Sequence, residues 1–67
     1  MSNDDVQTFQ GKLIKESDKA YQVDLKHEGV HWFPKSQCRI IHPKDAKVGD
    51  SIEIDVPEWL CHEKEIG

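Results

Sequence analysis

The residues of this 67-residue chain that are best suited to metal chemistry are two cysteines and four histidines. Among them, Cys38, His42, Cys61 and His62 carry the side chains that bind structural Zn²⁺. On a strand, Cys38 and His42 would share a face but lie about 13 Å apart, too far for one ion. On a helix, the adjacent Cys61 and His62 would diverge by about 100°. We therefore assign no metal ligands and expect reduced, unligated thiols, and a small zinc-stabilised module is only the last alternative.

Nucleophilic catalysis would need a nucleophile, a base and an oxyanion-stabilising group in one pocket. Ser36, Cys38 and Cys61 are nominal nucleophiles, but no G-x-S-x-G element, glycine-rich phosphate loop or paired-carboxylate motif accompanies them. A chain of 67 residues also has little room for a cleft or for a cofactor domain. We therefore expect a non-enzymatic domain that carries no cofactor.

The net charge of −4 hides an asymmetry along the chain. Residues 12–47 contain eight basic and five acidic residues, whereas residues 50–67 contain six acidic residues and one basic residue. A negative domain repels nucleic-acid phosphates at long range and suits a partner with a basic surface. The leading prediction is a protein-binding face formed by the acidic residues of the last two elements: Glu53, Asp55, Glu58, Glu63 and Glu65.

The alternative prediction is a face that binds single-stranded nucleic acid through an aromatic ring and nearby cations. Its candidate residues come from the basic middle of the chain: Lys26, Trp32, Lys35 and Arg39. Trp32 and Phe33 are neighbours on a predicted strand, so their side chains point to opposite faces. One of these two rings is expected in the core and the other at the surface, and the sequence leaves open which.

The elements that must position these residues follow from a hydrophobic pattern of period two. It predicts five strands and a terminal helix, at 6–15, 20–26, 30–33, 38–42, 51–56 and about 57–65. Residues 1–5 are polar and expected to be disordered, and 6–67 form one domain. The predicted class is mainly β (α+β): a small five-stranded antiparallel curled sheet or partial barrel, SH3-like or OB-like, with one C-terminal helix.

With few apolar residues available, nearly every large one is expected in the core. Phe9 and Leu13 should share one face of the first strand, with Gly11 marking a bulge or a close backbone approach. The other predicted core residues include a tryptophan that plugs one end of the barrel: Tyr21, Val23, Leu25, Ile52, Ile54, Val56, Trp59 and Leu60.

The first residues after Met1 are polar, and no apolar stretch is long enough to span a membrane. Two cysteines suit a reducing compartment, so we expect a cytoplasmic protein with no membrane contact.

Residues 32–37, WFPKSQ, match a W-x-P-K-S-Q element, and residues 56–67 match a helical ending that contains P-x-W-L. With these two stretches the chain resembles a group of short phage and prophage proteins. That group usually has an aliphatic residue in place of Cys38 and a small residue in place of Cys61, which suits thiols acting as small hydrophobic groups. The resemblance implies a phage or prophage interaction module that binds a host or phage protein, with proteins of nucleic-acid metabolism or defence as candidate partners.

Overall fold

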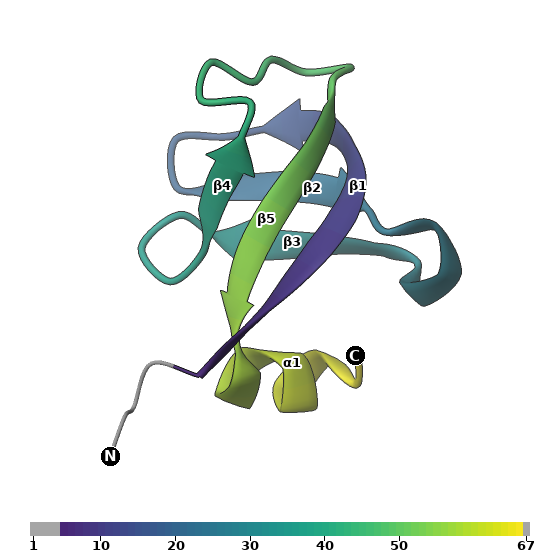
Figure 1. Cartoon of the computed structure of the whole chain (residues 1–67), viewed down its shortest axis with the longest axis vertical. Helices are drawn as coiled ribbons and strands as arrows, with labels where there is room; N and C mark the ends of the chain where they lie inside the picture. The colour runs from purple at the N-terminus through teal and green to yellow at the C-terminus, as the bar shows by residue number, and fades with distance from the viewer. Residues whose placement is uncertain (1–4, 67) are drawn as a thin grey trace.

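The computed structural model describes residues 5–66 and shows five strands and one α-helix (Figure 1). The strands are β1 (Val6–Glu16), β2 (Ala20–Asp24), β3 (Val30–Pro34), β4 (Arg39–His42) and β5 (Ser51–Pro57). A single 3₁₀ turn, η1 (Lys26–Glu28), joins β2 to β3, and the helix α1 (Glu58–Lys64) follows β5 directly. Apart from Asp5, the segment predicted to be disordered lies outside the described residues.

The strands form one antiparallel sheet in the order β3-β2-β1-β5-β4, which curls without closing (Figure 1). The predicted class, a curled five-stranded antiparallel sheet with one C-terminal helix, is therefore confirmed. Apart from the pairing of β1 with β5, hydrogen-bonded neighbours are consecutive in the chain. The chain passes from β3 at one edge of the sheet to β4 at the other edge, and β5 then returns to pair with β1.

The long strand β1 belongs to both halves of the curled sheet. Val6–Lys12 pair with β5, whereas Lys12–Glu16 pair with β2. The bend lies at Gly11, where a Cβ atom would come within 2.5 Å of the Asp24 carbonyl oxygen. The close backbone approach predicted at Gly11 is confirmed, and the register of β1 with β2 shifts further along, between Leu13 and Lys15.

The core lies inside the curl and is closed at one end by α1 (Figure 1). Six of the eight residues predicted for the core in β2, β5 and the segments after them are buried: Val23, Leu25, Ile52, Ile54, Val56 and Leu60. Leu13 is also buried, and Phe9 packs against the core from the same face of β1, as predicted. Tyr21 is only partly buried against this cluster.

The prediction that Trp59 plugs the barrel is wrong, because its side chain is 54% exposed. The backbone N–H of Glu58 donates to the carbonyl oxygen of Asp5, which fixes how α1 leaves the sheet. From that start, Leu60 and Cys61 face the core. Trp59 precedes Leu60 by about 100° of helix rotation and so points away from the core.

The short helix ends at Glu65, which adopts a left-handed conformation with φ of 59°. This turn brings Ile66 back onto the core beside Leu60. Among residues 5–66, no helix is both long and apolar enough to cross a membrane.

Candidate binding surfaces

The outer face of β5 carries the first two predicted acidic residues. Glu53 and Asp55 alternate with the buried Ile52, Ile54 and Val56, so both carboxylates point away from the core. The Gln10 amide donates to the Glu53 carboxylate at 3.0 Å, and the Thr8 hydroxyl donates to the Asp55 carboxylate at 2.5 Å. Residues of β1 therefore hold these two carboxylates in place.

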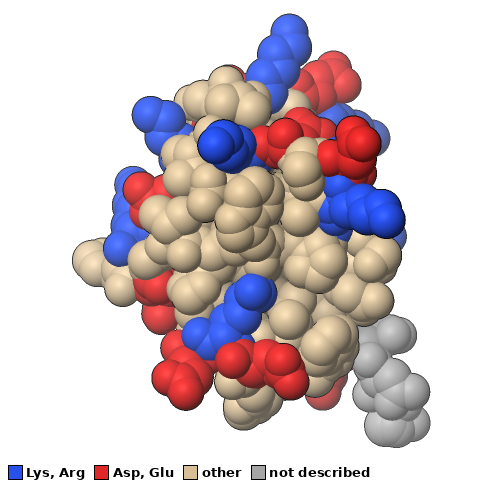
Figure 2. All heavy atoms as spheres, turned by 180° about the vertical axis from the view of Figure 1, so that it is seen from behind, with Lys and Arg blue, Asp and Glu red and all other residues tan. Residues whose placement is uncertain are grey.

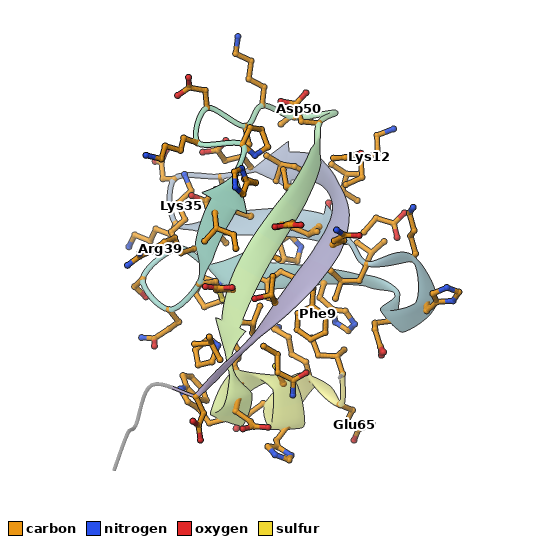
Figure 3. All side chains as sticks on the ribbon, viewed as in Figure 1. Phe9, Lys12, Lys35, Arg39, Asp50 and Glu65 are labelled. Carbon is orange, nitrogen blue, oxygen red and sulfur yellow. The ribbon has the colours of Figure 1, made fainter. Side chains whose placement is uncertain are left out.

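The remaining predicted acidic residues continue from β5 into α1. The Gln7 amide lies 3.4 Å from the Glu58 carboxylate. Glu63 and Glu65 are exposed, and Glu65 lies at the far end of the helix (Figure 3). We call Glu53, Asp55, Glu58, Glu63 and Glu65 the acidic strip, because β5 runs without a break into α1.

Within residues 5–66, no carboxylate of the acidic strip forms an ion pair. Arg39 faces Asp55 across the β4–β5 pair, yet within residues 5–66 the only ion pair is that of Lys35 with Glu16. The five carboxylates thus have no cation of the described chain within 4.0 Å. The arrangement can attract a positively charged surface at long range.

The four residues of the alternative nucleic-acid face come from different segments of the chain. Trp32 is on β3 and Arg39 is on β4, and these are the two edge strands of the sheet. Lys26 belongs to η1, between β2 and β3. Lys35 and Arg39 point outward on the same side of the molecule (Figure 3).

The Lys35 side chain already interacts with other residues of the domain. Its ammonium lies 2.6 Å from the Glu16 carboxylate and 5.0 Å from the centre of the Tyr21 ring. The hydrogen bond to Glu16 raises the pKa of Lys35. Its charge is therefore partly compensated before any ligand arrives.

The structure decides which of the two neighbouring rings is exposed. Phe33 is fully buried, whereas Trp32 is 41% exposed on the outer face of β3. Across the sheet, Trp32 pairs with Gln22, and Gln22 pairs with Lys15. Sequence reasoning missed Lys15 and Gln22, because their alignment with Trp32 depends on the register shift in β1.

The two thiols are free and buried. Burial raises the pKa of Cys38 to about 11 and also raises the pKa of Cys61. No group of three or more potential metal ligands gathers in the part of the chain that the structure describes. Both thiols fill space in the core beside Phe33, Leu60 and Ile66.

We expect the thiols to react slowly in the folded protein. Raising the pKa of Cys38 from 9.0 to about 11 lowers its thiolate fraction at pH 8 about 100-fold. Thiol labelling at pH 8 should therefore be far slower in the native protein than in urea. Because the pKa of Cys38 is higher in the folded than in the unfolded state, its contribution to stability should be fully present below about pH 9 and should be lost as the pH rises to about 11. Rapid labelling of both thiols in the native protein would contradict this account.

An open groove of about 730 Å³ borders the acidic strip at Glu53. It runs between the middle of β1, η1 and the end of β4, and Lys12, Lys26, His27 and His42 supply its cationic and imidazole groups. Its lining contains neither cysteine, so the thiols and the histidines of the chain are not brought together there.

Comparison with known proteins finds no matching family model, no matching curated protein and no matching solved structure. The resemblance to short phage proteins remains a prediction from the sequence.

Proposed function

We propose that this domain is a non-enzymatic protein-binding module whose acidic strip docks on a basic surface of a partner. The observation that supports it best is the run of five carboxylates along β5 and α1 without a cation of residues 5–66 within 4.0 Å. An excess of carboxylates without ion pairs steers a partner of opposite charge and favours one orientation of that partner. Hydrogen bonds from Gln10 and Thr8 hold Glu53 and Asp55 in place before binding, which lowers the ordering cost.

The resemblance to phage and prophage proteins supports a host or phage protein as the partner, including a protein of nucleic-acid metabolism or defence. Two free cysteines support a reducing cytoplasm as the site of action. The acidic strip is favoured over the basic set because Lys35 is already paired with Glu16, whereas the strip is unpaired among the described residues.

Charge reversal on the strip should abolish partner capture. The immobilised domain would be exposed to host lysate, and the recovered proteins of the wild type compared with those of a Glu53→Lys, Asp55→Lys, Glu63→Lys variant. We expect the specific partner to be lost, because three repulsive contacts replace three attractive ones. Nuclease treatment of a parallel sample separates direct protein binding from capture through nucleic acid.

The matched control also reverses three exposed acids, all away from the strip, in Asp18→Lys with Glu28→Lys and Asp45→Lys. These residues lie in the turn after β1, in η1 and in the loop after β4. The control should retain the partner. A partner lost equally from both variants would point to net charge alone, and a partner retained by the strip variant would refute the proposed face.

A further inference from the structure

The outer face of β2 and β3 is chemically unlike the acidic strip. These strands lie behind β1 and β5 in Figure 1, and the view from behind shows a broad uncharged area with cations and acids around its border (Figure 2). Trp32 and Val30 alternate with the inward-facing Phe33 and His31, and they are 41% and 48% exposed. An exposed tryptophan beside an exposed valine is a candidate contact surface.

The strand register arranges this face in two rows. The first row runs Lys15, Gln22, Trp32 across β1, β2 and β3, and the second runs Lys12, Asp24, Val30. Neighbouring strands lie roughly 4.8 Å apart, so the backbones of Lys15 and Trp32 are about 10 Å apart. A ring, an amide and an ammonium group thus follow one another along a line across the sheet.

The charge of this face is positive, in contrast to the whole molecule. Its outward ionisable groups are Lys12, Lys15 and Asp24, and the Asp24 carboxylate already accepts the backbone N–H of Lys26 at 2.8 Å. The acidic strip approaches this face at its β1 border, where Glu53 and Lys12 line the same groove, whereas Lys15 lies in the row of Trp32. Because charges are screened over a Debye length of about 8 Å, the nearer cations have the larger effect on a phosphate bound beside Trp32.

We infer that this face, centred on Trp32, binds single-stranded nucleic acid. One base stacks on the exposed indole, the Gln22 amide hydrogen-bonds the edge of that base, and Lys15 and Lys12 contact phosphates of the same strand. Stacking on an open sheet face with adjacent cations is how single strands are bound without strong sequence preference. The face is distinct from the acidic strip, so the two surfaces would let the domain hold a protein and a single strand together.

A fluorescein-labelled 12-residue oligothymidine is the probe. Anisotropy titration in 50 mM NaCl should give a dissociation constant on the order of 100 μM, in the range of non-specific binding. With two phosphate contacts, the affinity should fall about sevenfold between 50 and 200 mM NaCl. In a Trp59→Phe background, quenching of the remaining indole would report stacking on Trp32 directly.

Two pairs of variants separate this face from general charge effects. Trp32→Ala should weaken binding about 5- to 150-fold, the loss expected for one stacked base. Trp59→Ala, which removes the more exposed of the two tryptophans, should leave binding within twofold. Lys15→Glu should also reduce the affinity by tenfold or more, whereas Lys44→Glu, in the loop after β4, should have little effect. The melting temperature of each variant shows that it is folded.

Absence of binding at 1 mM protein in 50 mM NaCl would overturn the inference, as would binding that Trp32→Ala leaves unchanged. Loss of a captured protein, rather than of the oligonucleotide, in the Trp32→Ala variant would show that this face binds a protein instead. None of these results depends on the acidic strip, because its charge-reversal variant should bind the oligonucleotide at least as tightly as the wild type.

Discussion

The Phe33→Ala variant is expected to be unfolded at room temperature. Among the described residues, Phe33 has the largest fully buried side chain. Its ring centre lies 6.2 Å from that of His31 and 5.7 Å from the Lys64 ammonium of the helix. Truncating a buried phenylalanine costs about 3–5 kcal/mol, including the cavity that remains. A domain of this size rarely has more than about 3–5 kcal/mol of stability, so the loss removes the folded state.

Trp59→Ala is the matched control, because it removes a still larger aromatic side chain. About half of the Trp59 surface is exposed, so its truncation leaves a surface depression that water can fill rather than an internal cavity. We expect a loss of about 1 kcal/mol and an intact fold. Urea denaturation followed by circular dichroism compares the two variants. If the Trp59→Ala variant were unfolded and the Phe33→Ala variant were stable, the helix would have to pack on the core through Trp59.

Gly11→Ala is expected to have the second-largest effect, although it adds only one methyl group. The new Cβ atom would lie 2.5 Å from the Asp24 carbonyl oxygen and 2.9 Å from a Val23 methyl carbon. Backbone atoms of β2 cannot move aside without breaking the pairing of β1 with β2 at Lys12 and Leu13. We expect a loss of about 1–3 kcal/mol from this overpacking, measured as a lower urea midpoint.

Gly49→Ala tests whether the effect at Gly11 is steric. A Cβ at Gly49 meets no atom within 4 Å, but its φ of 103° is unfavourable for alanine. It should therefore lose about 1–2 kcal/mol from backbone strain alone. Relief by Val23→Ala in the Gly11→Ala background would be partial, because the carbonyl contact remains. A Gly11→Ala variant as stable as the wild type would show that β1 and β2 are farther apart than described.

Much of the fold could be predicted from period-two patterns and turn residues. In β5, Ile52, Ile54 and Val56 alternate with polar residues, which is the pattern of a strand with one face toward the core and the other toward solvent. The close backbone approach at Gly11 was also predictable from local sequence, because a glycine inside a strand often marks a bulge or a close backbone approach.

The orientation of Trp59 could not be predicted, because it depends on a long-range contact. The rotation of α1 is set by the bond between Glu58 and Asp5, residues far apart in the chain, and by the fit of Leu60 and Cys61. Helical spacing alone allows either Trp59 or Cys61 to join Leu60 on the buried side. Cys61 is smaller and fits the closed end of the curl.

The candidate surfaces were predictable only in part. The outward position of Glu53 and Asp55 follows from strand alternation, but the exposure of Trp32 rather than Phe33 depends on which face of β3 meets the core. The row of Lys15, Gln22 and Trp32 depends on a one-residue register shift in β1. No local sequence signal specifies that shift, so the basic residues near Trp32 in sequence are not its neighbours across the sheet.

The rate at which the captured partner associates is the most direct test of the acidic strip. Stopped-flow or surface-based kinetics would compare the wild type with an Asp55→Asn, Glu63→Gln variant between 50 and 300 mM NaCl. The proposed function predicts that neutralisation slows association about tenfold at low salt and that the difference disappears at high salt, because screening removes the attraction. An association rate that is the same for both proteins and insensitive to salt would contradict binding through the acidic strip.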